Sequence, residues 1–476
     1  MLIQEKPHVH FIGICGKAMG GIAAALMRQG WKITGSDEAH YSPMKEFLEA
    51  ASVPVSTPYS VKNIPPDTTL VVVGKRVSED NVELRHIIKK GLPFQSFPEF
   101  LHGQFLQHSR NAVVAGGVGK TTTSAMLTWI LESAGRQPDY LIGGLAKNLD
   151  QPARFAGEKF TVLEGDEYAS CFHDSRPKFL HYRPEVAVVT NIIEDHPDLY
   201  PQLSDLVAVF ARLTALLPAH GCLILSADDP NATPLAATAS CEVITVGTEK
   251  SATQRITGID LDSHRSSFRF LNTHFTLPLC GLMNIRNAAI AAAAAAHWNV
   301  TPAESAAALR TFRGVANRQE EKKIGSCSVI HDKASHPFSL VGLLQALRQR
   351  HPDRRVVSII QPRATGGKGW VYQKDLPEAL AGFDKVIIAA AYEHKPQRQQ
   401  AWENTPFCTD SLANDLAAQG TDVTVVTPLT EESLLQELLP GDVILISMSE
   451  QAAAQKALVE RTLLTLKRRG LATVSI

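Results

Sequence analysis

The chain has 476 residues, of which 44% are hydrophobic and 20% are charged, and its formal net charge is -1. At ~150 residues per domain this length predicts about three domains, and the composition excludes a disordered or fibrous protein. The balanced charge argues against a protein dedicated to binding nucleic acid, which would carry an excess of basic residues.

The sequence carries no motif for export, membrane insertion or zinc binding. The N-terminus lacks the cationic start and long apolar run of a secretory signal. The most apolar helical stretch, 288–296, is about half as long as a membrane span. Seven scattered cysteines without a CxxC pair indicate neither a disulfide scaffold nor a zinc site. We therefore expect a cytoplasmic protein with buried free thiols and no membrane partner.

The first unit of the chain alternates short apolar runs with helical patterns. Strands are predicted at 8–14, 31–37 and 68–74, and a helix is predicted at 20–30. Strands that alternate with helices indicate a parallel sheet whose two faces are both covered.

A glycine-rich turn between the first strand and the first helix is a candidate binding site. Gly13, Gly16 and Gly20 have the spacing GxxGxxxG, which differs from the GxGxxG of dinucleotide-binding loops. Asp37 ends the second strand, where an acidic residue can contact a ribose. The pattern is compatible with NAD, with the diphosphate of a UDP-sugar, or with a tight turn that binds nothing.

The second unit opens with a phosphate-binding loop, the most specific motif in the chain. Residues 116–121 read GGVGKT and lie between a predicted strand and a predicted helix at 122–135. Glycines let backbone N–H groups surround phosphate oxygens, and the helix N-terminus favours anions. Lys120 would contact the β- and γ-phosphates, and Thr121 would ligate Mg²⁺. Because Val114 stands at the first glycine position of GxxxxGK[ST], this loop is a shortened variant.

Two candidate metal ligands follow the next predicted strands, at 161–166 and 185–192. Glu164 emerges from an apolar strand, and His196 follows the second strand. The carboxyl ends of parallel strands meet at one edge of a sheet, so both residues are expected near the phosphate loop. Mg²⁺ prefers oxygen ligands, which favours Glu164. His196 is expected to bind a second divalent ion, with a hydrogen-bonded turn as the alternative.

A third unit is predicted from strands at 354–363, 383–391, 422–428 and 441–449. The predicted fold is therefore α/β, with a Rossmann-like N-terminal domain, a central phosphate-loop ATPase domain and a Rossmann-like C-terminal domain. The expected domain limits are 1–108, 109–316 and 317–476.

These motifs, in this order, resemble those of the Mur ligase family over nearly the whole chain. AGGVGKTTT, EGDEY, NIIEDHPDLY and CGLMNIRNAAIA resemble the family's central ATPase motifs, and GICGKAMGG with GSD resembles its UDP-sugar domain. The resemblance implies a ligase that uses ATP and Mg²⁺. It would join an amine to a carboxylate of a UDP-N-acetylmuramoyl precursor through an acyl phosphate.

Three further stretches resemble the murein peptide ligase branch of the family: LIGGLAKN at 141–148, DSRPKFLHYRP at 174–184 and QPRATGGKG at 361–369. That resemblance implies that UDP-N-acetylmuramate is joined to the recycled tripeptide L-alanyl-γ-D-glutamyl-meso-diaminopimelate. Peptidoglycan recycling and cell wall biogenesis would be the setting of this reaction.

The resemblance also implies a set of site residues. The residues expected to act in catalysis are Lys120, Glu164, His196, Arg318 and His336. Those expected to contact ATP are Gly116, Gly119, Lys120, Thr121, Thr122, Asn284, Asn287 and Arg318. Those expected to contact the other substrates are Gly13, Gly16, Met19, Gly20, Ser36, Asp37 and Arg363. The expected metal ligands are Thr121, Glu164 and His196.

Several site motifs depart from the family pattern. Gly117 and Val118 replace the Thr and His of GTHGKT, Met283 replaces the His of GxHN, and Gln361 replaces the Glu of EPR. Residues 447–452 replace a glycine-rich loop. Two alternatives therefore stay open: a Mur-type ligase with another acceptor such as L-alanine, and a lapsed ligase that binds nucleotide or UDP-sugar. The phosphate loop argues against an NAD-dependent dehydrogenase.

Overall fold

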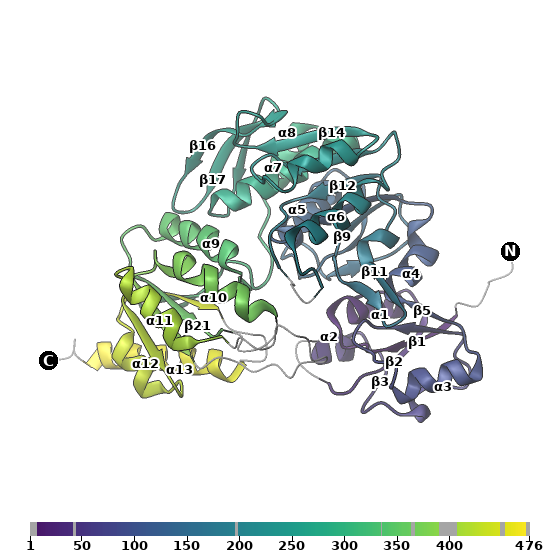
Figure 1. Cartoon of the computed structure of the whole chain (residues 1–476), viewed down its shortest axis with the longest axis horizontal. Coiled ribbons are helices and arrows are strands. Elements are labelled where there is room, and N and C mark those ends of the chain that lie inside the picture. Colours follow the sequence, from purple (N-terminus) through teal and green to yellow (C-terminus); the bar gives the residue numbers. More distant parts are fainter. Residues whose placement is uncertain are drawn as a thin grey trace.

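A computed structural model shows three α/β units, each built on its own sheet (Figure 1). This confirms the fold class that the sequence predicts. The structure describes residues 7–40, 44–195, 199–334, 336–362, 367–389, 407–447 and 453–472.

The N-terminal unit is a five-stranded parallel sheet in the order β3-β2-β1-β4-β5. Its middle strand, β1, is buried at every residue because helices cover both faces of the sheet. The strands are β1 (His8–Ile12), β2 (Lys32–Ser36), β3 (Val55–Ser56), β4 (Leu70–Val73) and β5 (Phe94–Ser96). The helices are α1 (Lys17–Arg28), α2 (Met44–Ala50), α3 (Val82–Lys90) and α4 (Phe97–Leu101).

The central unit contains an eight-stranded sheet in the order β15-β14-β13-β12-β6-β9-β7-β8, which is parallel except for the pair β7–β8. Its strands are β6 (Arg110–Ala115), β7 (Asp139–Leu141), β8 (Ala153–Arg154), β9 (Phe160–Glu164), β12 (Val186–Val189), β13 (Cys222–Ser226), β14 (Glu242–Gly247) and β15 (Gln254–Arg255). Its helices are α5 (Lys120–Ser133), α6 (Leu203–Thr214), α7 (Leu282–His297) and α8 (Pro302–Leu309).

Two antiparallel additions to the central unit were not predicted. One is the hairpin of β10 (Ala169–Cys171) and β11 (Asp174–Pro177). The other is the sheet of β16 (Thr257–Leu261), β17 (Ser266–Phe270) and β18 (Thr273–Leu277). Their strands are short, and β16 is exposed along its whole length. Such strands lack the continuous apolar run that identifies a strand in a parallel sheet.

The C-terminal unit is a six-stranded sheet in the order β19-β20-β24-β21-β22-β23, in which only β19–β20 is antiparallel among the described strands. The strands are β19 (Glu320–Ile324), β20 (Cys327–His331), β21 (Val356–Ile360), β22 (Lys385–Ala389), β23 (Val423–Val426) and β24 (Val443–Ser447). The helices are α9 (Pro337–Arg350), α10 (Gly367–Leu380), α11 (Thr409–Ala418), α12 (Glu431–Glu437) and α13 (Ala453–Ala472).

The strand order of the central sheet determines where its polar loops meet. β6 lies between β12 and β9 and is parallel to both. The segments that follow these three strands therefore come together at one edge of the sheet. Within the described ranges, no helix has the length and apolar composition that crossing a membrane requires.

Candidate active site

A cavity of about 260 Å³ lies at this edge, between the central and C-terminal units. It is lined by the phosphate loop, the first turn of α5, the N-terminal part of α7, and residues of the C-terminal unit up to α9. The predicted site residues that line it are Gly119, Lys120, Thr121, Thr122, Glu164, Asn284, Asn287, Arg318 and His336. The predictions for His196 and Arg363 lie outside the described residues.

The phosphate loop is held in place by Asn191, which follows β12. The Val118 N–H donates to Asn191 Oδ1 (2.8 Å), Asn191 Nδ2 donates to the Val118 carbonyl (2.8 Å), and the Gly117 N–H donates to the Asn191 carbonyl (3.1 Å). Gly116 has φ +135°, and a side chain there would collide with Thr190. The segment that follows β12 therefore determines the shape of the loop. The role of Asn191 in holding the loop was not predicted from the sequence.

Two glycines of the loop have distinct roles in its geometry. Gly117 stands where the family carries Thr, and a Cβ atom at this position would collide with Ile193, so the glycine and the isoleucine fit one another. Gly119 caps α5 with φ +92° and without a side-chain hydrogen bond. The first N–H groups of a helix have no intrahelical acceptor, so the start of α5 can donate to phosphate oxygens.

Lys120 supplies positive charge at the base of this cavity. Its Nζ donates to the Gly116 carbonyl and lies 3.4 Å from Glu167 Oε2. Burial lowers the pKa of Lys120, but the carboxylates of Glu167, Asp166 and Glu164 outweigh burial and hold this pKa above its usual value. The lysine is therefore charged and complements a phosphate group. Glu167 lies within the EGDEY segment, but sequence reasoning did not include it among the site residues.

Glu164 and Thr121 form the pair that could hold a divalent cation. Thr121 Oγ1 donates to Glu164 Oε1 (2.9 Å), and the Gly143 N–H donates to Glu164 Oε2 (2.6 Å). Burial, followed by the negative charge of Asp166, raises the pKa of Glu164. A half-buried carboxylate next to a hydroxyl is an all-oxygen donor set, which fits Mg²⁺.

Asp166 has a different environment, although it is two residues from Glu164. Burial raises the pKa of Asp166, but Lys178, whose Nζ lies 2.9 Å from Asp166 Oδ2, and then Lys120 outweigh burial and hold this pKa low. The Asp166 carboxylate is thus already neutralised by a protein cation. Of the two acidic residues, Glu164 is therefore the better candidate ligand for a metal ion.

The two predicted asparagines of α7 occupy different positions in the cavity wall. Asn284 Nδ2 donates to the Cys280 carbonyl (2.8 Å), so its amide stabilises the start of the helix. Asn287 lies against the phosphate loop, where its Oδ1 would be 2.7 Å from a Cβ atom added to Gly119. Met283, which replaces the family's His, contacts Gln319 Nε2 through its sulfur (3.8 Å).

Arg318 enters the cavity from the segment that connects the central and C-terminal units. Its Nη1 lies 3.9 Å from Asp332 Oδ1. Asp332 also accepts hydrogen bonds from the N–H groups of Gln319 and Ala334, both at 2.7 Å. Burial raises the pKa of Asp332, and Arg318 opposes this rise. Asp332 was not among the predicted site residues, because its contact with Arg318 depends on tertiary structure.

His336 connects the C-terminal unit to the central unit. As the N-cap of α9, its Nδ1 accepts from the Phe338 N–H (3.2 Å), and its Nε2 lies 3.0 Å from the Glu194 carbonyl. Because Nδ1 is an acceptor, Nε2 carries the proton and donates to Glu194. His336 therefore both starts a helix and joins two units across the cavity.

We expect two substitutions of His336 to separate these roles. His336→Ala removes the cap and lowers the free energy of unfolding by about 1 kcal/mol. His336→Asn keeps a capping oxygen but is too short to reach Glu194. Loss of one interdomain hydrogen bond, about 1 kcal/mol, should raise KM for ATP about fivefold in both variants. Thermal unfolding and ATP titrations measure the two effects, and a wild-type KM in the Asn variant would contradict the interdomain role.

The glycine turn of the N-terminal unit is stabilised by Asp37. Asp37 Oδ2 accepts from the Cys15 N–H (2.8 Å), and Gly13 has φ +85°. Gly16 is the N-cap of α1 and has no side-chain cap, so the start of this helix resembles the start of α5. A cavity of about 210 Å³ adjoins the turn at Cys15. It is also lined by His40, which precedes α2, and by Lys45 in the first turn of α2.

The other predicted substrate residues of this unit are buried. Ser36 is fully buried and donates to Glu83. Met19 and Gly20 lie on the buried face of α1, where a side chain at position 20 would collide with Met44. These positions shape the turn from behind, whereas Gly13, Gly16 and Asp37 form the turn itself.

The N-terminal unit also reaches the edge of the cavity in the central unit. Lys75, which follows β4, places its Nζ 3.6 Å from the centre of the Tyr168 ring. Tyr168 lines the cavity that holds Lys120. The side of the N-terminal unit that carries the carboxyl end of β4 therefore faces the phosphate loop.

The central unit carries a phosphate loop on a largely parallel sheet, and the two other α/β units both reach the cavity beside this loop. This arrangement is typical of a nucleotide-binding enzyme of the multidomain ligase type. The chain belongs to the Mur ligase family: residues 8–109 match the Mur ligase family catalytic domain, and residues 114–295 match the Mur ligase middle domain. Members of this family are ATP-dependent ligases that form carbon–nitrogen bonds. The resemblance inferred from the motifs is thus confirmed.

Similar proteins come from two branches of the family. The UDP-N-acetylmuramate–L-alanyl-γ-D-glutamyl-meso-2,6-diaminoheptandioate ligase of Haemophilus influenzae is 32% identical over 83% of this chain and 87% of that protein. The UDP-N-acetylmuramate–L-alanine ligase of Lactococcus lactis is 32% identical over 82% of this chain and 84% of that protein. The crystal structure of a murein peptide ligase from Psychrobacter arcticus superposes with a TM-score of 0.70 at 27% identity, over 97% of this chain and 99% of that chain.

Proposed function

We propose that this chain uses ATP and Mg²⁺ to join UDP-N-acetylmuramate to the tripeptide L-alanyl-γ-D-glutamyl-meso-diaminopimelate. The observation that carries the proposal is the meeting of charged Lys120, the uncapped start of α5 and the Glu164–Thr121 pair in one cavity. The ligase of Haemophilus influenzae that is named for these two substrates supports the choice of substrates.

In this mechanism the muramyl carboxylate attacks the γ-phosphorus of ATP, which gives an acyl phosphate and ADP. The amine of the tripeptide then attacks the acyl carbon, and the tetrahedral intermediate collapses to the amide and phosphate. The chain mainly positions reactants and neutralises charge. Lys120 and the first N–H groups of α5 balance the phosphate charge. Thr121 and Glu164 would hold Mg²⁺, which neutralises the transferring phosphoryl group when it is bound.

The arrangement of the units supports a shared reaction centre. Lys75 and Tyr168 connect the N-terminal unit to the cavity, and His336 and Arg318 connect the C-terminal unit to it. A UDP-sugar on the N-terminal unit would thereby reach ATP on the central unit. Such ligation needs the C-terminal unit to close over both.

A mass-spectrometric ligation assay tests this function. It contains ATP, Mg²⁺ and UDP-N-acetylmuramate with either the tripeptide or L-alanine, and the Lys120→Ala protein is the blank. We expect the tripeptide adduct. An adduct with L-alanine alone would contradict the proposed acceptor, and the L-alanine ligase of Lactococcus lactis makes that acceptor the second candidate. No adduct from a protein that still binds ATP and UDP-N-acetylmuramate would indicate a lapsed ligase.

We expect Gly16→Trp to weaken UDP-N-acetylmuramate binding at least tenfold, about 1.4 kcal/mol, without changing ATP affinity. Gly16 has φ -64°, and the nearest atom to an added Cβ is 3.5 Å away, so the fold accommodates a side chain. The indole would cover the start of α1. Calorimetric titration measures both ligands, with Gly103→Trp as control, since Gly103 borders open space. Wild-type affinity in the Gly16 variant would contradict this UDP-sugar site.

A further inference from the structure

A cluster of side chains that could hold a metal ion lies in the central unit, away from the cavity between the central and C-terminal units that contains Lys120 (here called the ATP cavity). Cys222 is the first residue of β13, Glu242 is the first residue of β14, and His297 is the last residue of α7. Their ligand atoms all lie within 4.8 Å of one another. None of the three residues lines the ATP cavity. The cluster lies at the amino ends of the strands, opposite the edge that carries the phosphate loop.

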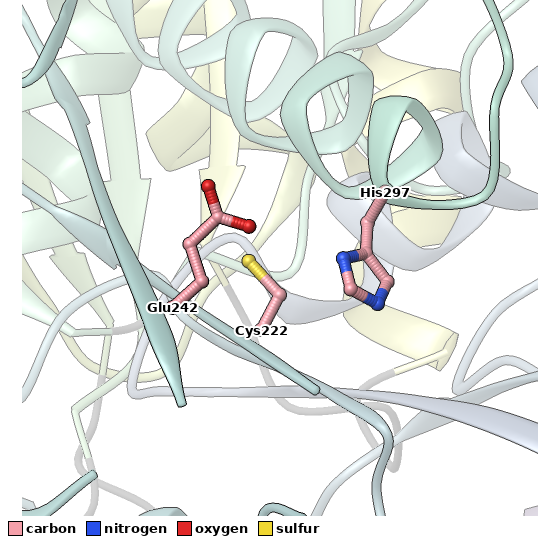
Figure 2. Close-up of side chains that lie close together, drawn as sticks. All are labelled: Cys222, Glu242 and His297. Atoms are coloured by element: carbon pink, nitrogen blue, oxygen red, sulfur yellow. The ribbon is translucent and has the colours of Figure 1, made fainter. Parts of the chain in front are cut away.

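The fold brings these residues together in a defined register. β13 and β14 are parallel neighbours, and Cys222 is the direct partner of Glu242 across them. α7 packs over both strands, which places its C-terminal residue above the start of each. Figure 2 shows the Cys222 sulfur between the Glu242 carboxylate and the His297 ring, with a ring nitrogen facing the sulfur.

The orientation of His297 is what a metal ligand requires. Its Nε2 lies 3.3 Å from Glu185 Oε1 and donates to this carboxylate, which leaves the other ring nitrogen, on the side of Cys222, available as a ligand atom. Metal-bound histidines commonly donate their other nitrogen to a carboxylate in this way. Glu185 is itself held by Arg110 Nε (2.8 Å) and Trp298 Nε1 (3.2 Å), which makes it a rigid support.

The electrostatic surroundings also favour a cation. The C-terminal end of α7 carries the negative end of the helix dipole. Glu242 is exposed and has no ion-pair partner among the described residues, whereas Cys222 is fully buried. The exposed carboxylate gives an ion a route from solvent to the buried sulfur.

We propose that Cys222, Glu242 and His297 bind a divalent transition-metal ion, and that Zn²⁺ fits this sulfur, oxygen and nitrogen set best. Zinc bond lengths of about 2.0 to 2.3 Å place tetrahedral ligands roughly 3.5 Å apart, so small side-chain rotations complete the site. Water fills the fourth position, and the thiol proton of Cys222 is released to solvent on binding.

The ion would act as a structural link rather than in the reaction. It ties two strands of the central sheet to the end of α7, and the start of the same helix carries Asn284 and Asn287 of the ATP cavity. At 1.5 Å per residue, His297 is about 15 Å along the helix from Asn287. The site therefore supports a wall of the cavity without touching ATP.

Zinc binding by the full-length chain tests the proposal, with a chromophoric chelator as competitor and with excess Mg²⁺ and ATP present to occupy the other cavity. We expect one Zn²⁺ per chain, at least tenfold weaker binding in Glu242→Gln, and loss of binding in Cys222→Ala. Cys327→Ala is the matched control, because Cys327 is a buried cysteine of the C-terminal unit. Zinc should raise Tm in the wild type and the control but not in Cys222→Ala.

Cobalt substitution identifies the ligands directly, because a thiolate–cobalt bond gives a charge-transfer absorption in the near ultraviolet. This absorption should appear in the wild type and in Cys327→Ala and be absent in Cys222→Ala. If Cys222→Ala does not fold, Glu242→Gln and His297→Gln must each weaken zinc binding. The site is wrong if the wild type binds no zinc, if these variants bind it normally, or if the cobalt absorption survives in Cys222→Ala.

Discussion

Replacing Lys120 by alanine should lower kcat/KM for ligation by about 10²–10³-fold, because one charge-stabilising contact contributes about 2.7–4 kcal/mol in a closed site. Lys120 Nζ is buried beside the phosphate loop and surrounded by three carboxylates. In the proposed mechanism it balances the charge of the transferring phosphoryl group. ADP formation and ligated product measure the effect.

The fold should survive this substitution. The substitution removes the hydrogen bond from Lys120 to the Gly116 carbonyl, but the hydrogen bonds between the loop and Asn191 remain, so circular dichroism and domain structure should match the wild type. Lys62→Ala is the control, since Lys62 is an exposed lysine of the N-terminal unit. If Lys120→Ala turned over at the wild-type rate, this would contradict the prediction that residues 116–121 bind the phosphates of ATP, and with it the proposed mechanism.

Replacing Glu164 by glutamine should have opposite effects on activity and on stability. The expected loss in kcat is about 10²–10³-fold, since the cation site loses its carboxylate. The amide is isosteric and can accept from the Gly143 N–H while it donates to Thr121, so the local hydrogen bonds of Glu164 can be kept.

The sign of the stability change follows from the raised pKa of Glu164. A carboxyl group whose pKa is higher in the folded state binds its proton more tightly there. Unfolding free energy therefore falls as the pH rises from the ordinary value of 4.5 through the raised pKa. At neutral pH the raised pKa of Glu164 therefore lowers the unfolding free energy of the metal-free fold, and the amide removes this cost. Glu164→Gln should therefore have the higher Tm without ligands, by a margin that shrinks as the pH is lowered.

Ligands should reverse this order. Mg²⁺ with ATP should raise the Tm of the wild type more than that of Glu164→Gln, because only the wild type provides the carboxylate. Thermal scans with and without Mg²⁺ and ATP measure the crossover, and Glu249→Gln at an exposed position is the control. A Glu164→Gln protein that is less stable without ligands, or equally active, would contradict the role of Glu164.

Much of the ATP cavity was predictable because its signals are local in sequence. Gly116, Gly119 and Lys120 occur within five consecutive residues after an apolar strand, and Glu164 ends another such strand. Glycine at positive φ and a helix N-terminus are properties of the backbone, so the residue order alone indicates them. The α/β class and the family resemblance follow from the same short patterns.

The contacts that hold these residues were not predictable because they join distant segments. Asn191 holds the loop from another strand, Glu167 faces Lys120 from beyond β9, and Asp332 faces Arg318 across a turn. Whether a polar side chain points into a cavity or into the core depends on packing. Ser36 illustrates this point: its position suggested substrate contact, but its hydroxyl is buried against Glu83.

The sequence by itself determined the α/β class, the phosphate loop with Lys120 and Thr121, and the family. These features could be recognised because a strand, the glycine-rich loop after it and the helix that follows are formed by residues that are neighbours in the sequence. Tertiary structure alone decided that His336 reaches Glu194 across two units. It also decided that Cys222, Glu242 and His297 meet at one end of the central sheet. Their separation along the chain shows no metal-binding spacing, and only the register of β13 with β14 and the packing of α7 bring their ligand atoms together.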